Sequence, residues 1–307
     1  MNVEMPLTRE WVKNEFDGDM VLCTHVMPGS LFVRRETINM GAEPDRWRVE
    51  DGVLSIMDGE GRHVAYEFGG VEGVNGSVVL TGATNLQASS FGHMRAVAYR
   101  EHLLADADFG VAISSHVAYE DITLPRLLAS LRANGVPDEK IVLVVAGDHS
   151  VDAPVSLTDS AITHVRVKDE LLGFAALPYL RDTHAYWLLL HDTCELTSDF
   201  EDRVAEVDVG MNYDFISVAD DGLQCEIGFW RSRFLTGLPD SVWQMKAIDL
   251  HRHLMAHTKA RCSLPVSTQK TGKIRDVYGT GVQRKVLTYD GLGIKKYVGA
   301  SMMGGRP

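Results

Sequence analysis

Acidic and polar side chains follow directly after the apolar segment 186–190, and they are well placed to do chemistry. The segment ends in His191, Asp192 and Thr193. Such an apolar run predicts a strand buried on both faces of a sheet. A carboxylate just past it lies at the carboxyl edge, where open α/β folds bind ligands. Aspartate there can hold a hard cation against a phosphate or act as a base, or it can simply cap a helix predicted over 200–207.

A second carboxylate, Asp148, follows the strand predicted over 141–146. Because parallel strands end at one edge of a sheet, Asp148 and Asp192 are expected to face one crevice. Asp148 could accept hydrogen bonds from a base or ribose, and Asp192 could hold Mg²⁺ or Mn²⁺ on a diphosphate. Other polar residues follow a strand predicted over 111–113 and could line the crevice or only form a turn and a helix cap. They are Ser114, Ser115, His116 and Tyr119.

The charge of −12 over 307 residues is unevenly spread. Residues 258–307 carry ten Lys and Arg against two Asp, a local charge of +8. The acidic remainder disfavours a general nucleic-acid-binding role, because phosphate contacts need broad positive surface. The basic segment could clamp a phosphorylated ligand through Arg284 and Lys285, as a tail or lid, or it could only balance charge within the fold.

The composition is that of a globular protein, with 45% hydrophobic and 23% charged residues. No apolar run has the length of a membrane span, and residues 1–17 are charged, so neither a membrane span nor a secretory signal is expected. A reducing cytoplasm is the expected compartment, because the cysteines form no CxxC pair. They are Cys23, Cys194, Cys225 and Cys262.

The chain changes character near residue 107. Before it, short strands separated by turn-forming residues predict a smaller β-rich region over 1–106, serving packing, acceptor recognition or homo-oligomer formation. Its strands are expected at 20–23, 30–33, 47–49, 53–57, 63–68 and 77–81, followed by a helix or strand over 93–104. From residue 109, strands alternate with helices, which predicts an α/β domain over 107–257 with a Rossmann-like mixed sheet and helices on both faces.

The elements expected in that domain follow one another along the sequence. Strands are predicted at 111–113, 141–146, 162–167, 185–190, 215–219 and 226–230. Helices are predicted at 124–131, with Pro125 near the first turn, at 170–177, at 200–207 and at 241–256. Residues 258–307 are left as a basic tail or lid with glycine-rich turns.

This order of motifs resembles the GT-A-fold glycosyltransferases, especially the inverting family-2-like group. The resemblance covers about 109–256, roughly half of the chain, and it is carried by 111–116 with the 124–131 helix, by 140–148 and by 187–193. It implies that Asp148 binds the nucleoside. It also implies that His191-Asp192-Thr193 stands in place of the D-x-D metal motif, with His191 and Asp192 as ligands of Mn²⁺ or Mg²⁺.

The resemblance also implies a catalytic base and a further metal ligand. The segment 225–235 matches the family well and 248–252 loosely, which makes Asp249 the preferred base, ahead of Asp240 and Glu226. Asp249 could instead only pair with a neighbouring cation on its helix. In several GT-A enzymes a downstream histidine ligates the metal, and His257 would hold that place here, unless it belongs to a solvated helix face.

Three functions are weighed. The first is a glycosyltransferase of the hexosyltransferase type, which moves a sugar from a nucleotide-diphosphate donor to an unknown acceptor hydroxyl with metal assistance. The second is a sugar-phosphate nucleotidyltransferase, which is weakened because no glycine-rich basic loop follows the strand at 111–113. The third is a catalytically inactive GT-A-like binding or assembly protein, with the β-rich region as its contact surface.

Overall fold

The computed structural model describes residues 7–26, 31–74, 77–84, 94–106, 108–147, 161–168, 171–218, 226–258, 261–263 and 269–299. The chain forms two compact units. The first comprises Met1–Leu103, Asp208–Tyr213 and Ala260–Pro265, and the second comprises Leu104–Val207, Asp214–Lys259 and Val266–Pro307. Most of the basic C-terminal segment therefore belongs to the second unit, and its strands lie beside the elements that carry the candidate site.

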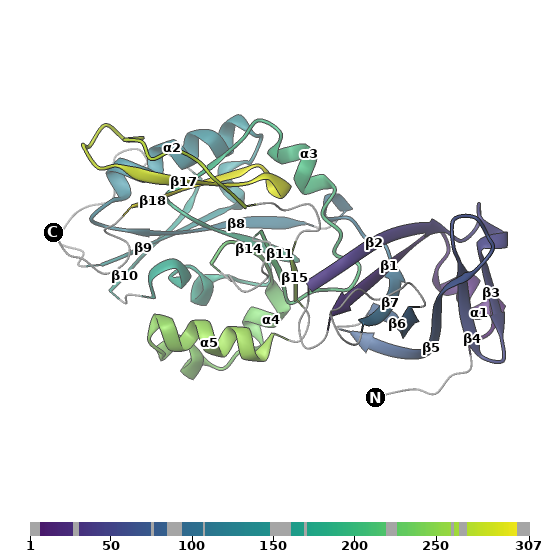
Figure 1. The fold of residues 1–307 in the computed structure, drawn as a ribbon. Helices are drawn as coiled ribbons and strands as arrows, with labels where there is room; N and C mark the ends of the chain where they lie inside the picture. The colour runs from purple at the N-terminus through teal and green to yellow at the C-terminus, as the bar shows by residue number, and fades with distance from the viewer. Residues whose placement is uncertain are drawn as a thin grey trace. The chain divides into compact units, whose positions relative to one another are not determined.

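The first unit is built on an antiparallel sheet with the strand order β2-β1-β7-β6-β5-β4-β3 (Figure 1). Its strands are β1 (Asp19–Val26), β2 (Leu31–Asn39), β3 (Trp47–Glu50), β4 (Val53–Met57), β5 (Val64–Val74), β6 (Ser77–Thr84) and β7 (Met94–Arg100). The turn between β3 and β4 has positive φ at both Asp51 and Gly52, as a tight antiparallel hairpin requires. The six predicted strands are confirmed, and β7 decides the helix-or-strand alternative in favour of a strand.

A helix that the sequence pattern did not reveal contributes to the core of the first unit. Helix α1 (Arg9–Glu15) is capped by Thr8, whose hydroxyl oxygen accepts a hydrogen bond from the Trp11 backbone at 3.1 Å. Val12 of this helix packs with Phe16 and with apolar side chains of the sheet. Only one face of α1 is buried, so its other positions are occupied by charged and polar residues.

The second unit contains a mixed sheet whose strand order creates a ligand-binding edge. Along it lie β10 (Thr163–Val167), β9 (Ile141–Ala146), β8 (Phe109–His116), β11 (Tyr186–His191), β14 (Gly228–Arg231) and β13 (Phe215–Ser217). The first four are parallel, and β14 is antiparallel to β11. In chain order the parallel strands run third, second, first, fourth, so the order reverses between β8 and β11. In open α/β sheets such a switch point, at the carboxyl ends of the strands, is where ligands bind.

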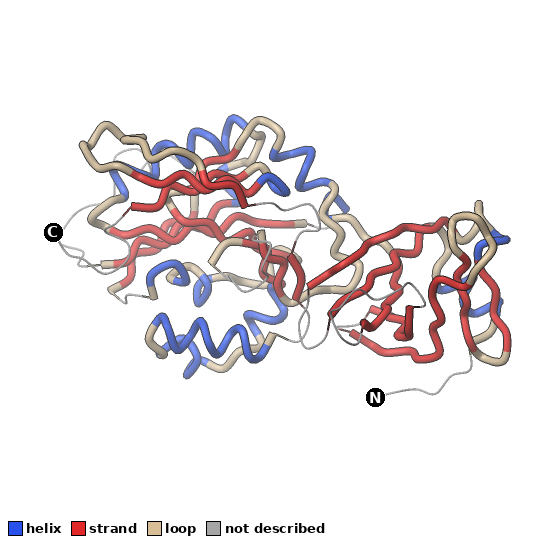
Figure 2. Tube along the Cα trace, viewed as in Figure 1, coloured by secondary structure: helices blue, strands red, loops and turns tan. Residues whose placement is uncertain are grey.

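Helical segments cover both faces of this sheet (Figures 1 and 2). Helix α2 (Glu120–Ala133) lies on one face, and α4 (Ser232–Thr236) and α5 (Ala247–His257) lie on the other with the short turns η5 (Leu172–Phe174) and η6 (Leu177–Tyr179). The apolar cluster on the second face includes Ala112 and Leu189. Because side chains alternate along a strand, the residues next to these point toward α2. The predicted mixed α/β sheet with helices on both faces is confirmed.

The predicted helix boundaries need three corrections. Helix α2 begins at Glu120, so Pro125 lies beyond its first turn. The helix predicted over 241–256 is divided into η7 (Asp240–Gln244) and α5 by extended backbone at Met245 and Lys246. The helical spacing of apolar residues continues across this two-residue break, so the sequence pattern did not reveal the break. The described part of 170–177 forms η5 and the start of η6, two short turns, rather than one helix.

A small antiparallel sheet takes up much of the predicted C-terminal tail. Its order is β12-β18-β17-β16, and its strands are β12 (Cys194–Leu196), β16 (Gln269–Thr271), β17 (Arg284–Tyr289) and β18 (Ile294–Gly299). Strand β12 begins just after the end of β11 and contacts α2. Its pairing with β18 therefore brings the basic strands β17 and β18 to the carboxyl edge of the large sheet (Figure 1).

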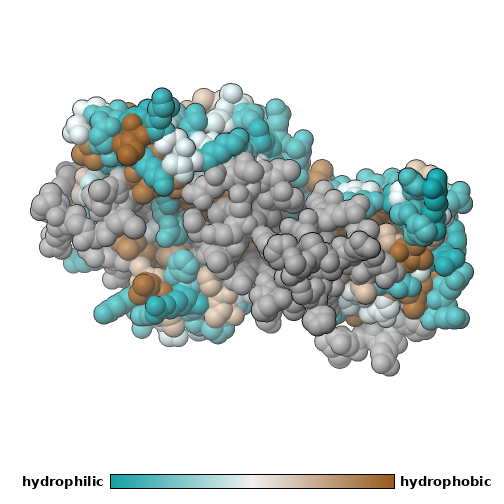
Figure 3. All heavy atoms as spheres, in the orientation of Figure 1, coloured by the Kyte–Doolittle hydropathy of each residue, from teal (hydrophilic) through white to brown (hydrophobic). Residues whose placement is uncertain are grey.

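The remaining elements are short. They are α3 (Phe200–Ala205), β15 (Arg261–Ser263), η1 (Pro44–Arg46), η2 (Leu104–Asp106), η3 (Asp138–Lys140) and η8 (Asp290–Leu292). In the described parts of the chain, no helix combines the length and apolar character needed to cross a membrane. On the face drawn in Figure 3, hydrophilic side chains cover much of the described surface, with smaller apolar patches among them.

Candidate functional site

A hydrogen bond crosses the switch point between β8 and β11. Ser115, near the end of β8, donates its hydroxyl to Oδ2 of Asp192, the first residue after β11, at 2.7 Å. Both side chains are buried, with 6% and 5% of their surface exposed. The Asp192 backbone N–H donates to the Ser114 carbonyl at 3.2 Å, which extends the parallel pairing of the two strands by one step. The structure thus brings together two of the predicted site residues.

The Asp192 carboxylate is held in a low-dielectric position by several donors. Burial raises its pKa above the ordinary value, and this is the largest influence. Hydrogen bonds from Ser115 and Thr123 and the positive charge of Arg284 act in the opposite direction. The net pKa is raised, so folding disfavours the ionised form of Asp192, which a merely structural ion pair would favour.

Arg284, at the start of β17, supplies a positive charge close to Asp192. Its side chain is 5% exposed, its guanidinium carbon lies 5.2 Å from the ring centroid of Tyr278, and its Nε has no hydrogen-bond partner. The hydroxyls of Tyr278 and Thr193 also lack partners although the atoms are buried. Burial and the Asp192 carboxylate raise the pKa of Tyr278 well above its usual value, so the phenol keeps its proton. Two buried groups with unused hydrogen-bonding capacity, on Arg284 and Tyr278, thus lie near one carboxylate, as at a site built for a polar ligand.

His191 points to the opposite face of the sheet. It is paired in register with Ser114, whose Oγ accepts a hydrogen bond from the Ala176 backbone on the η5–η6 side. A Cβ added at Gly173 of η5 would lie 2.3 Å from Nε2 of His191, so the ring packs directly on this glycine. Nε2 has no hydrogen-bond partner. Burial, followed by the charge of Lys296, holds the pKa of His191 well below its usual value, and the ring is neutral at pH 7.

Glu226 and Lys296 form a second charged pair near the end of β11. Lys296, in β18, is 9% exposed and places Nζ 3.3 Å from Oε2 of the half-exposed Glu226. Its partner in register is Cys194, two residues beyond Asp192. Burial raises the pKa of the Cys194 thiol to about 11. Of the three predicted bases, Glu226 is therefore the one that the structure ties to the strand end.

The other predicted bases and the third predicted metal ligand are surface residues in α5 and η7. Asp249 is exposed and lies 3.7 Å from Arg252, the local pairing that was weighed as its alternative role. Asp240 is exposed and lines a pocket described below. The exposed His257 places Nδ1 2.8 Å from the backbone oxygen of His253 and stacks on its ring at 3.9 Å. No contact links these residues to the described neighbours of Asp192.

Three further predicted ligand-binding residues, His116, Tyr119 and Lys285, lie in or next to elements near the same sheet edge. His116 ends β8, with its Nδ1 accepting a hydrogen bond from the Ala118 backbone, and Tyr119 immediately precedes α2. Lys285 is an exposed residue of β17. Asp148, the predicted nucleoside-binding residue, lies outside the described residues.

The groups around Asp192 are not arranged as a set of metal ligands. His191 and Asp192 point to opposite faces of the sheet, so they do not share one cation. Within the described ranges, no group of three or more His, Cys, Asp and Glu side chains is arranged to hold a metal ion. The described residues near Asp192 therefore do not fit a resident Mn²⁺ or Mg²⁺, which favours several oxygen ligands. The predicted metal site stays a prediction.

Some residues of this region were not among those predicted. Thr123 and Tyr278 approach Asp192. Lys296, which belongs to the predicted basic lid, reaches Glu226. Arg126 of α2 pairs with Glu195 at 3.0 Å and approaches the hydroxyl of Tyr297, which also donates to Glu195. The available signal was the excess of Lys and Arg after residue 258, but the fold of that segment had to be known to assign individual partners.

Comparison with known proteins gives limited matches. No protein-family model matches the chain, and no curated protein does. TarS of S. aureus (residues 1–349) is similar over 51% of this chain and 58% of that one, at 12% sequence identity and a TM-score of 0.36. The glycosyltransferase GlyE of Streptococcus pneumoniae TIGR4 is similar over 52% and 45%, at 14% identity and a TM-score of 0.34. The chain thus spans about half the length of these two proteins.

Proposed function

We propose that the second unit transfers a sugar from a nucleotide-diphosphate donor to an acceptor hydroxyl. The observation that carries the proposal is the buried Asp192 at the switch point, bonded to Ser115 across the reversal in strand order and facing Arg284. A carboxylate whose ionised form is disfavoured by burial is costly to keep, and such groups concentrate at functional sites. The order of motifs that resembles GT-A-fold glycosyltransferases supports the choice of reaction.

The positive charges at this edge support binding of a diphosphate. Arg284 has a free Nε–H and Lys296 adds a second cation from the neighbouring strand. A guanidinium donates hydrogen bonds in a planar fork that suits phosphate oxygens. Asp192, with its hydroxyl donors, would keep Arg284 oriented before the donor arrives. The neutral phenol of Tyr278 and the hydroxyl of Thr193 would add donors that do not charge the site further.

In the reaction, an acceptor hydroxyl attacks the anomeric carbon while the bond to the diphosphate breaks. The new carbon–oxygen bond forms as the hydroxyl proton passes to a carboxylate, for which Glu226 is the proposed base. The electron pair of the broken bond leaves on the diphosphate. Arg284 and Lys296 would offset the negative charge that grows on the diphosphate. Such electrostatic stabilisation of the transition state is usually the largest single contribution to catalysis.

The proposal is tested by measuring binding and turnover with purified protein. UDP, GDP and their hexose conjugates are titrated by calorimetry, with EDTA and separately with Mn²⁺, and release of free nucleotide is followed by chromatography. At least one donor should bind and release its nucleotide. Asp192→Asn should weaken binding at least about tenfold, because Arg284 loses its orienting partner. Asp202→Asn, an exposed carboxylate of α3, is the matched control and should bind normally.

The outcomes separate the alternatives that the sequence left open. No nucleotide binding with or without Mn²⁺ would overturn the proposal. Binding without release of nucleotide would favour the inactive binding protein, and incorporation of a nucleoside triphosphate into a sugar diphosphate would favour the nucleotidyltransferase. Binding that requires Mn²⁺ would support the predicted metal site, whereas equal binding in EDTA would assign the charge compensation to the cationic side chains.

A further inference from the structure

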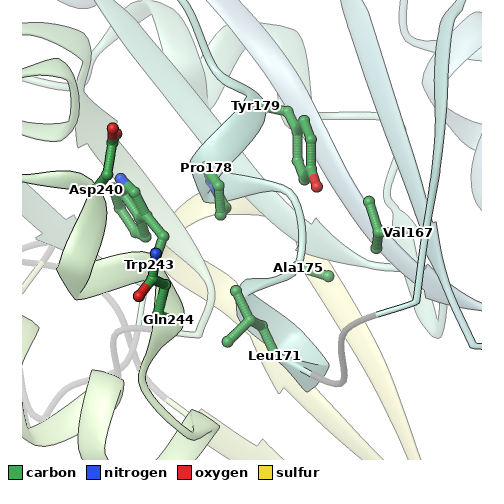
Figure 4. Close-up of a pocket in the computed structure, with 8 residues that line it drawn as sticks. All are labelled: Val167, Leu171, Ala175, Pro178, Tyr179, Asp240, Trp243 and Gln244. Atoms are coloured by element: carbon green, nitrogen blue, oxygen red, sulfur yellow. The ribbon is translucent and has the colours of Figure 1, made fainter.

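A pocket of about 280 Å³ opens beside the carboxyl end of β10, away from the bond between Ser115 and Asp192 (Figure 4). All of its lining belongs to the second unit. The lining residues are Val167, Leu171, Ala175, Pro178, Tyr179, Asp240, Trp243 and Gln244. The volume lies just below the range of about 300–1,000 Å³ that holds drug-sized ligands, so it suits a single ring with its substituents.

The position of the pocket links it to the strand ends of the candidate site. Val167 is the last residue of β10, and the carboxyl ends of the parallel strands share one edge of the sheet. Leu171 and Ala175 of the lining flank η5, the same turn whose Gly173 packs on His191. One short segment therefore touches both the pocket and the residue that ends β11.

The lining combines an apolar floor with aromatic walls. Val167, Leu171 and Ala175 are buried, and Figure 4 shows them on the side of the hollow opposite Trp243. The rings of Trp243 and Tyr179 come from η7 and η6, with Pro178 between them in this view. The side chains of Asp240 and Gln244 lie at the η7 edge, where they can accept or donate hydrogen bonds.

We propose that this pocket binds one uncharged sugar ring. The C–H faces of a pyranose are weakly apolar and pack on aromatic rings, while its hydroxyls need neutral or acidic hydrogen-bonding partners at the edge. Trp243, Tyr179 and Pro178 provide the packing surface for the C–H face. Asp240 and Gln244 provide the hydrogen-bonding partners for the hydroxyls. The assignment of this pocket as the acceptor site rests on the proposed glycosyl transfer. The binding of a sugar ring in the pocket does not depend on that proposal.

Charge argues against a nucleotide in the same place. Among the eight lining residues, all of them described, there is one carboxylate and no Lys, Arg or His. A phosphate would meet the Asp240 carboxylate with no cation in the lining to offset it, a juxtaposition that costs binding energy. The cationic residues Arg284 and Lys296 belong to the other cluster, so a charged donor and an uncharged acceptor would occupy chemically distinct places.

The experiment observes the pocket directly and without a donor. The full chain is labelled with 5-fluorotryptophan, and the ¹⁹F resonance of Trp243 is identified by its loss in Trp243→Phe. Methyl glycosides of glucose, galactose, mannose and N-acetylglucosamine are titrated at millimolar concentration, with UMP and glucose 6-phosphate as charged counterparts. At least one glycoside should shift the Trp243 resonance in a saturable manner, and the charged compounds should shift it less.

Variants show whether the shift arises in this pocket. Trp243→Ala should weaken the glycoside at least about tenfold, measured by saturation-transfer NMR. Gln244→Ala, at an exposed position, should weaken it about twofold to tenfold by removing one neutral hydrogen bond. Ile248→Ala, a 63% exposed residue of α5 outside the lining, is the matched control and should bind as the parent chain does.

Two results would overturn the inference. One is the absence of any glycoside-induced change at Trp243 in the parent chain, and the other is tighter binding of UMP than of every glycoside. Because Gln244→Ala changes an exposed side chain, it keeps the test decisive if Trp243→Ala does not fold. Failure of the proposed sugar transfer would be recognised separately. It would appear as a lack of nucleotide binding in the calorimetry, independently of the result with the glycosides.

Discussion

Replacing Ser115 by alanine tests the hydrogen bond on which the candidate site is built. The substitution removes the hydroxyl that donates to Oδ2 of Asp192 at 2.7 Å and leaves the backbone pairing of β8 with its neighbours in place. Both partners are almost fully buried, so water cannot replace the lost donor without entering the core. The effect on stability therefore reports the charge state of Asp192 in the folded protein.

The expected magnitude follows from the kind of bond. A hydrogen bond to an ionised group contributes about 1.5–3 kcal/mol, against about 0.5–1.5 kcal/mol for a neutral pair. Thr123 and Arg284 still stabilise the carboxylate in the variant, which limits the loss. At pH 7, Ser115→Ala should lower the free energy of unfolding by about 1.5–3 kcal/mol.

The loss should depend on pH in a defined direction. Burial raises the pKa of Asp192 above the ordinary 3.8, so folding favours its protonated form and the cost of the buried charge appears as pH rises through the folded pKa. Removing Ser115 raises that pKa further. Below the folded pKa of the parent, Asp192 is protonated in both proteins, and the loss should fall to about 0.5–1.5 kcal/mol. It should grow as pH rises through the interval between the two folded pKa values and then become constant.

Urea unfolding of both proteins, followed by tryptophan fluorescence at several pH values from 4 upward, measures this difference. Ser232→Ala is the matched control, because the buried hydroxyl of Ser232 donates to a backbone carbonyl oxygen, that of residue 184. A peptide carbonyl has no titratable proton in this pH range. The effect of this control should be independent of pH. A loss for Ser115→Ala below about 0.5 kcal/mol at pH 7, or one that does not change with pH, would refute the ionised, hydroxyl-bonded Asp192.

Three further predictions concern other residues near the end of β11. Lys296→Met should raise the pKa of His191 but leave it below 6.5, because burial remains its largest cause, and NMR titration of the imidazole measures this. The Cys194 thiol, with its pKa raised to about 11, should resist iodoacetamide at pH 8 in the folded chain and react after unfolding, as read by mass spectrometry. Gly173→Ala should destabilise the protein by about 1–3 kcal/mol in urea unfolding, and adding His191→Ala should restore part of the loss, since a Cβ there would lie 2.3 Å from the ring.

Buried strands were the most predictable part of the fold. The runs at 141–146 and 186–190 are apolar because both faces of the sheet are covered, and composition alone indicates such strands. The basic strands β17 and β18 were not predicted, because Arg284, Lys285, Lys295 and Lys296 interrupt the apolar pattern. Two of these cations are nonetheless buried, since Tyr278 stacks on Arg284 and Glu226 pairs with Lys296. Glu226 lies 70 residues away from Lys296 along the chain, so the burial of this lysine could not be inferred from local composition.

The predictions for the candidate site also differed according to whether they rested on strand order or on contacts between distant residues. Parallel strand ends meet at one edge, and this rule alone brings Ser115 and Asp192 together, as the structure bears out. The preferred base, Asp249, rested on a loose motif match, and it lies on an exposed helix face beside Arg252. The proposal of Glu226 rather than Asp249 as the base rests on its contact with Lys296, and spacing along the sequence carries no information about that contact.

The alternation of side chains along β11 has the largest consequence for the chemistry. Neighbouring residues at a strand end point to opposite faces, so a motif whose acidic groups stand two residues apart presents both to one ligand, whereas His191 and Asp192 cannot do so. Here the residue two before Asp192 is Leu190, which is buried, and the chain turns at Asp192 and Thr193, so the alternation ends there. Strand β11 therefore presents no second carboxylate on the face of Asp192. The charge of Arg284 and the hydroxyls of Ser115 and Thr123 favour the ionised form of Asp192, and this guanidinium is the group that we propose to bind a donor diphosphate.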